Sequence, residues 1–117
     1  MPTRHTETES SWSSMMSMVE DFHLKHDFKN TGGEDLPYRV ALMAEELGEI
    51  SSCVTKGKTK EALSEEVADL LILIMGTAIA ANFDLSSAFS IKMDKLMRRD
   101  SRMINGKIRV SEFRDMS

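Results

Sequence analysis

Apolar residues recur every three or four positions through most of this 117-residue chain, and turn-forming residues interrupt the pattern at only a few places. Such spacing is that of one face of an α-helix. The glycines at residues 32–33, Gly57 and the Asn82-Phe83-Asp84 stretch separate four periodic segments. Because short connections join these segments, the sequence predicts an all-α fold built as one four-helix bundle.

The first two helices are bounded by local signals. Residues 1–12 are polar and are predicted to be a flexible segment, with the first helix starting at Ser13 or Ser14. The second helix is expected to start at Pro37, since its first turn does not use the missing N–H, and to end near Gly57. The predicted apolar stripes are Met15, Met18, Val19 and Phe22 in the first helix, and Val40, Met43, Leu47 and Ile50 in the second.

The third helix is expected to begin at Thr59 or Ser64 and to run to about Ala81. Its second half, residues 70–75, is apolar on every face, which predicts enclosure by other helices or by a second subunit. Asp84 is the predicted N-cap of the fourth helix. The stripe of that helix is expected to be Leu85, Phe89, Met93 and Leu96 or Met97.

The helical domain is predicted to span residues 13–102, and residues 103–117 form a short C-terminal extension. In this extension, short alternating apolar segments flank Asn105-Gly106, which is a hairpin signal.

Composition narrows the functional classes. A hydrophobic fraction of 41% and a charged fraction of 29% are those of an ordinary globular domain. The single cysteine, Cys53, excludes an intrachain disulfide, and no charged-then-apolar leader precedes it, so we expect a cytoplasmic protein. The longest apolar run, residues 70–81, is shorter than the ~20 residues of a membrane span. We therefore expect no membrane partner.

Charge is distributed unevenly along the chain. Residues 1–90 hold seven Lys or Arg against fifteen Asp or Glu, whereas residues 91–117 hold eight against four. General nucleic-acid binding needs a continuous basic face, so nucleic acid is not an expected partner. The distribution suits a site where carboxylate-bound metal and basic side chains meet phosphate.

Two helices carry closely spaced carboxylates. Glu45, Glu46 and Glu49 lie on the second helix, and Glu66 and Asp69 on the third. Residues three apart share a helix face, so two carboxylate pairs converge if these helices pack antiparallel. Such a group needs a divalent cation, and oxygen ligands favour magnesium or manganese over zinc. The alternative is a solvated acidic face.

The spacing Glu45-Glu46-x-x-Glu49, then sixteen residues, then Glu66-x-x-Asp69, resembles the signature of the all-α NTP pyrophosphohydrolase superfamily, which includes MazG, dimeric dUTPases and dCTP pyrophosphatases. The resemblance covers residues 22–99. It implies hydrolysis of a nucleoside triphosphate to a monophosphate and pyrophosphate in nucleotide-pool house-cleaning, by a MazG-like homodimer or homotetramer. Leu96 stands where relatives commonly carry asparagine.

The resemblance also implies roles for individual residues. Glu46, Glu49, Glu66 and Asp69 would be ligands of Mg²⁺, for which Mn²⁺ could substitute. Glu45 would be catalytic, either orienting the attacking water or binding a second ion. For the base, the implied residues are Phe22, His23 and Phe28. The phosphate-binding residues follow from charge placement: Lys92, Lys95 and Arg99 recur at three-and-four spacing and are expected to share one helical face, and Lys56 lies beside the Gly57 turn.

Each substrate-binding assignment has a plain alternative. The basic residues can equally be a solvated helix end, since cations are favourable there, and Phe22 can be an ordinary core residue. Two other functional classes stay open beside the hydrolase. A di-iron bundle would need Glu-x-x-His on two helices, but Glu49 and Asp69 stand where the two histidines would be required, which disfavours that class. A non-catalytic adaptor or antitoxin-like oligomerisation module should ignore magnesium.

Overall fold

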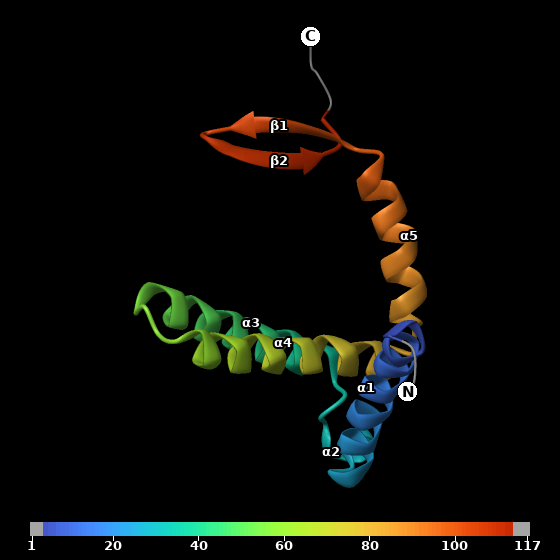
Figure 1. The fold of residues 1–117 in the computed structure, drawn as a ribbon. Helices are drawn as coiled ribbons and strands as arrows, with labels where there is room; N and C mark the ends of the chain where they lie inside the picture. Colours follow the sequence, from blue (N-terminus) through green and yellow to red (C-terminus); the bar gives the residue numbers. More distant parts are fainter. Residues whose placement is uncertain (1–3, 114–117) are drawn as a thin grey trace. The chain divides into compact units, whose positions relative to one another are not determined.

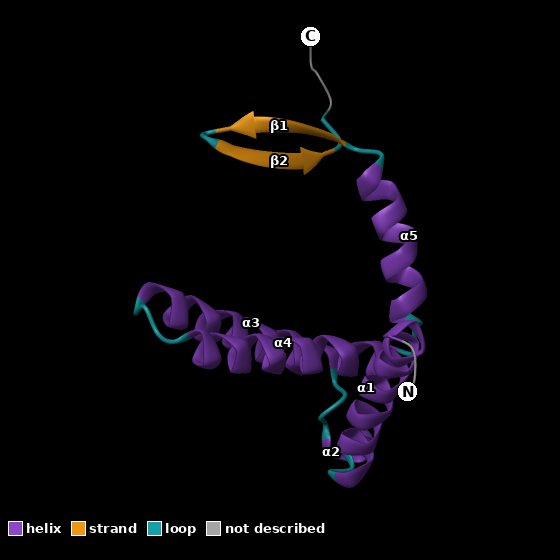
Figure 2. Ribbon diagram, in the orientation of Figure 1, coloured by secondary structure: helices purple, strands orange, loops and turns teal. Residues whose placement is uncertain are grey.

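A computed structural model describes residues 4–113, and in that part of the chain five helices precede a two-stranded hairpin (Figure 1). The elements are α1 Arg4–Lys25, α2 Phe28–Thr31, α3 Leu36–Thr55, α4 Lys60–Ala81, α5 Leu85–Met97, β1 Asp100–Ile104 and β2 Lys107–Ser111. The all-α class and the C-terminal hairpin are confirmed (Figure 2). The helix beyond the four that the sequence predicted is α2, a single turn just before the glycines at residues 32–33.

The first helix is longer than predicted. It begins at Arg4, so the expected N-cap at Ser13 or Ser14 is wrong. Residues 4–12 contain no glycine or proline and continue the helix although they lack an apolar stripe. Apolar periodicity marks only those turns of a helix whose apolar side chains pack, so it gave no signal for these turns. Of the predicted stripe, Val19 is buried, whereas Met18 is 70% exposed.

The helices α3 and α4 form an antiparallel pair and pack along their length (Figure 1). The side chain of Asp35 caps α3 by accepting a hydrogen bond from the backbone, and Pro37 lies in the first turn as predicted. Gly57 has a φ of 61°, which allows the short connection, and Thr59 caps α4. This pair carries all five of the predicted carboxylates.

The predicted stripe of α3 is half right, because Met43 and Ile50 are half-buried as expected. Val40 and Leu47 are each 60% exposed, so their assignment to the core stripe is wrong. The other residues of α3 that are buried or half-buried are Arg39, Leu42, Glu46, Ser52 and Cys53. Two of these residues, Arg39 and Glu46, are charged, and a search for apolar residues alone passes over them.

The core lies where α1 and α3 meet the second half of α4. Met75 and Ala78 are almost fully buried there. In the single chain the expected enclosure of α4 is incomplete, because Leu71, Ile72 and Ile74 keep 37–41% of their surface exposed. Among the described residues no single helix is long and apolar enough to cross a membrane, although α4 and α5 together pass that test as a broken pair.

The chain divides into two compact units, Met1–Phe83 and Asp84–Ser117, and each is described by itself. In the second unit the side chain of Asp84 caps α5, as predicted. Met103 pairs with Ile108 in the antiparallel hairpin. Asn105 and Gly106 have φ angles of 51° and 78°, which suits the tight turn that the sequence predicted.

Candidate metal centre

Three carboxylates meet between α3 and α4. Glu46 comes from α3, and Glu66 and Asp69 come from one face of α4. One carboxylate oxygen from each residue lies within 4.8 Å of the other two. The predicted convergence of the two helices therefore holds for these three side chains, which we call the carboxylate cluster.

Glu46 is the member of the cluster with the most unusual surroundings. Its Oε2 atom is buried and has no hydrogen-bond partner among the described residues. Burial raises the pKa of Glu46, and the nearby carboxylates of Asp69, Glu66 and Glu49 raise it further. An ionised carboxylate in such a place is costly unless a cation or a proton compensates it.

The cluster fits a divalent metal ion. It offers three oxygen donors from two rigid helices, and one buried oxygen is left without a partner. Oxygen-only donor sets suit magnesium and manganese, whereas zinc prefers nitrogen and sulfur ligands. The donor chemistry thus agrees with the cofactor expected from the sequence.

The other two predicted acids lie beside the cluster. Glu49 is exposed one turn after Glu46, close enough for its charge to raise the pKa of Glu46. Glu45 is exposed on α3. Neither belongs to the group of oxygens within 4.8 Å, so the ligand role of Glu49 and the catalytic role of Glu45 stay predictions.

The carboxylate cluster adjoins an open apolar groove of about 640 Å³. Glu46 and Asp69 lie at its polar margin. The apolar lining comes from α1, α3 and α4 and includes Met15, Met18, Phe22, Leu42, Leu71, Ile72 and Met75. A groove of this size is within the range of small-molecule sites.

The predicted aromatic residues gather at the end of α1. The ring centroids of Phe22 and Phe28 are 5.2 Å apart, and those of His23 and Phe28 are 4.8 Å apart. Phe22 is 44% exposed, whereas His23 is buried, with Nδ1 2.7 Å from Oε2 of Glu34. Phe22 is therefore the ring of this group most open to a ligand.

The predicted phosphate-binding residues lie apart from the cluster or in the other unit. Lys56 is exposed at the C-terminal end of α3, ten residues and about 15 Å along the helix from Glu46. Lys92 and Lys95 are exposed on α5. Whether these lysines bind phosphate stays a prediction.

Arg99 does not share the helical face of Lys92 and Lys95, so the predicted shared face is wrong, whereas phosphate binding by Arg99 stays a prediction. The helix α5 ends at Met97, and a strand begins at Asp100. Nη2 of Arg99 lies 3.6 Å from Oε1 of Glu112 in the second unit. The three-and-four spacing of Lys92, Lys95 and Arg99 continues past the end of α5, where it no longer defines a helical face.

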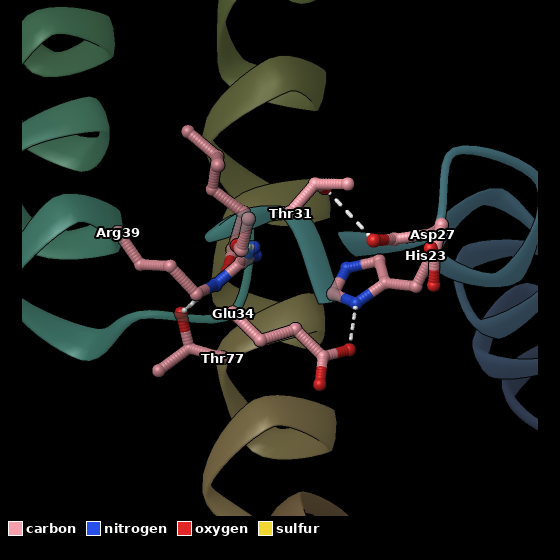
Figure 3. Close-up of polar contacts among 8 residues, drawn as sticks. His23, Asp27, Thr31, Glu34, Arg39 and Thr77 are labelled. Carbon is pink, nitrogen blue, oxygen red and sulfur yellow. Dashed lines mark hydrogen bonds and ion pairs between the residues drawn. The ribbon is translucent and has the colours of Figure 1, made fainter. Parts of the chain in front are cut away.

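The structure also reveals a buried polar network that the sequence predictions missed (Figure 3). Arg39, on α3, is only 2% exposed. It donates hydrogen bonds to Oγ1 of Thr77 and to the backbone oxygens of Gly33 and Leu73, at 3.1, 2.9 and 2.9 Å. Its position seven residues before Glu46, on the same helical face, was the available signal.

A model of the MazG nucleotide pyrophosphohydrolase domain matches residues 38–104 of this chain. The chain belongs to the MazG family. The match covers most of α3 and all of α4, α5 and β1, and with them the carboxylate cluster. MazG domains act on nucleoside triphosphates and typically depend on a divalent metal, so membership of the family supports an enzyme of the nucleotide pyrophosphohydrolase class. No curated protein and no solved structure gave a match.

Proposed function

We propose that this MazG protein is a Mg²⁺-dependent pyrophosphohydrolase that converts a nucleoside triphosphate and water to a monophosphate and pyrophosphate. We further propose a house-cleaning role in the cytoplasm, with deoxynucleotides or damaged nucleotides as substrates. The observation that carries the proposal is the unpartnered Oε2 atom of Glu46 inside the carboxylate cluster.

In this proposal Glu46, Glu66 and Asp69 hold the metal, and Glu49 adds a ligand from the next turn of α3. The ion, when bound, would polarise the phosphoryl oxygens, favour deprotonation of the attacking water and neutralise charge on the leaving pyrophosphate. Mn²⁺ has the same preference for oxygen ligands and is expected to substitute.

The remaining roles belong to side chains of this chain. The carboxylate of Glu45 would accept a hydrogen bond from the attacking water and orient it. The apolar groove would exclude solvent beside the cluster, with Phe22 offering an exposed ring edge or face to the base. Lys56, Lys92, Lys95 and Arg99 would supply positive charge for the triphosphate.

We also propose that the enzyme works as a homodimer or homotetramer. Leu71 and Ile72, which line the groove, and Ile74 are partly exposed on α4. Exposed apolar side chains on a core helix are typical of a subunit interface. Burial of this surface by a second copy would complete the enclosure of α4 expected from its sequence.

Product identification tests the proposed reaction. The full-length protein is incubated with a panel of ordinary and modified NTPs and dNTPs, with Mg²⁺ or with EDTA, and the products are separated by anion exchange. Monophosphate and pyrophosphate should appear together and only with the metal. Primary release of orthophosphate would contradict the reaction, and a chain indifferent to Mg²⁺ towards every nucleotide would favour the adaptor alternative.

A further inference from the structure

Arg39 occupies a core-facing position of α3, two helical turns before Glu46. Its guanidinium makes three hydrogen bonds, to Thr77 and Leu73 of α4 and to Gly33 in the loop before α3 (Figure 3). Burial lowers the pKa of Arg39, while the charge of Glu34 opposes this effect. A buried guanidinium is tolerated when its donors are satisfied in this way.

The residues of α4 that contact Arg39 and Glu46 are separated by the same number of positions as Arg39 and Glu46 themselves. Arg39 and Glu46 are seven residues apart on α3. On the antiparallel helix, Leu73, which Arg39 contacts, is likewise seven residues from Glu66, which lies beside Glu46. The contact of Arg39 with α4 and the carboxylate cluster are therefore consequences of one longitudinal alignment of the two helices.

Two features make this alignment hard to change. A slide by one helical turn would move the backbone by about 5.4 Å and separate the guanidinium from both of its acceptors on α4. Gly76, between those acceptors, also lets the arginine approach, because a methyl group there would overlap the Arg39 guanidinium and the His23 ring. A neighbouring position on α4 would present a side chain instead.

We propose that Arg39 is a positioning residue for the carboxylate cluster: its hydrogen bonds to α4 set the register that brings Glu46 to Glu66 and Asp69. This inference rests on the proposed function, because it assumes that the cluster holds a divalent ion. Arg39 itself acts through the helix alignment, and it is not a metal ligand.

Binding of Mn²⁺ to the full chain, followed by electron paramagnetic resonance without nucleotide, tests the inference. Arg39→Met removes all three hydrogen bonds and should raise the Mn²⁺ dissociation constant about tenfold or more, the scale on which supporting residues affect metal sites. It should also change the line shape of the bound ion. Arg39→Lys keeps the charge but has one nitrogen, and is expected to restore the melting temperature more than the Mn²⁺ affinity.

Cys53→Ala is the matched control. Cys53 is buried on α3, seven residues beyond Glu46, and so is as distant from Glu46 along the helix as Arg39 is. Its truncation should lower the melting temperature and leave Mn²⁺ affinity within twofold of wild type. If Arg39→Met does not fold, Thr77→Val, which removes one acceptor and keeps the arginine, is expected to weaken Mn²⁺ binding severalfold.

The inference would be overturned if the folded Arg39 variants bound Mn²⁺ with wild-type affinity and line shape. If Arg39→Met does not fold, the same result in Thr77→Val would overturn it. An equal loss of affinity in Cys53→Ala would also overturn it, since general destabilisation would then explain the effect. Glu46→Gln separates this failure from failure of the proposed function. If Glu46→Gln binds Mn²⁺ like wild type, the metal site itself is wrong. If only Glu46→Gln loses the ion, the register inference alone fails.

Discussion

The guanidinium of Arg39 lies against Gly76 of the neighbouring helix, at a point where a methyl group would overlap it. The glycine thus allows a charged side chain to reach the backbone of α4. Its lack of a side chain matters here for space, since Gly76 lies within the regular helix. The same position is crowded by the buried ring of His23.

Gly76→Ala should destabilise the protein by roughly 1–3 kcal/mol, because the added methyl group forces Arg39 and His23 to move in a packed region. Chemical denaturation measures the change. Gly48→Ala is the control, since Gly48 lies in α3 with no other atom near its missing side chain. That variant should be stabilised by about 0.5–1 kcal/mol. Equal effects at both glycines would contradict the packing described here.

The stability of the metal-free protein should depend on pH through Glu46. Burial and nearby carboxylates raise the pKa of Glu46 in the folded chain. The folded chain then keeps this proton to a higher pH than the unfolded chain does. The stability that the protonated group contributes is fully present below the ordinary pKa of glutamate, and is lost as pH rises through the raised value.

In EDTA, the wild-type melting temperature should therefore fall over this mildly acidic window as the pH rises. Glu46→Gln should lack that part of the pH dependence, because its amide does not titrate. Mg²⁺ should oppose the fall, since it binds the ionised form. Identical pH profiles for wild type and Glu46→Gln would show that Glu46 does not titrate as its surroundings indicate.

Lys95 is expected to contact the triphosphate. Lys95→Ala should lower kcat/KM by roughly ten- to a hundred-fold, the loss of one charge-assisted contact. Arg98→Ala is the control, since Nη2 of Arg98 already lies 2.8 Å from Oδ2 of Asp94. It should stay within twofold of wild type. Steady-state kinetics in which both variants match wild type would assign these residues to a solvated basic surface.

The exposed side of α4 is expected to be a subunit interface. The solution mass by light scattering should be at least twice the 13.2 kDa of one chain. Ile74→Asp should reduce that mass, because it places a charge in an apolar contact. Val54→Asp, at an exposed apolar position on α3, should not. A wild-type monomer at micromolar concentration would exclude the proposed assembly.

Signals carried by a few neighbouring residues were predicted well from the sequence. Asp84 as a helix cap, Pro37 in a first turn and Gly57 after a helix end each depend on local backbone geometry. The convergence of Glu46 with Glu66 and Asp69 followed from helical spacing and one short connection.

The charged residues on the buried face of α3 could not be predicted from such local signals or from apolar spacing. A search for apolar residues finds Met43 and Ile50, which are half-buried, but it also selects Val40 and Leu47, which are exposed. It passes over Arg39 and Glu46, which face the interior. Functional residues occupy core positions at a cost to the apolar pattern, so the pattern fails where the site lies. The hydrogen bond of Arg39 to Thr77 joins residues 38 positions apart on two different helices. The spacing of residues along a single helix does not reveal such a contact.

The most direct test of the metal centre compares nucleotide turnover by wild type, Glu46→Gln and Asp69→Asn as Mg²⁺ is varied. Glu65→Gln, an exposed acid on α4 outside the cluster, is the control. Pyrophosphate release should be saturable in Mg²⁺ for wild type and Glu65→Gln, and abolished in both cluster variants. These should remain folded and at least as stable without metal, because like-charge repulsion is removed. Near wild-type release by either cluster variant would contradict the assignment of the metal centre.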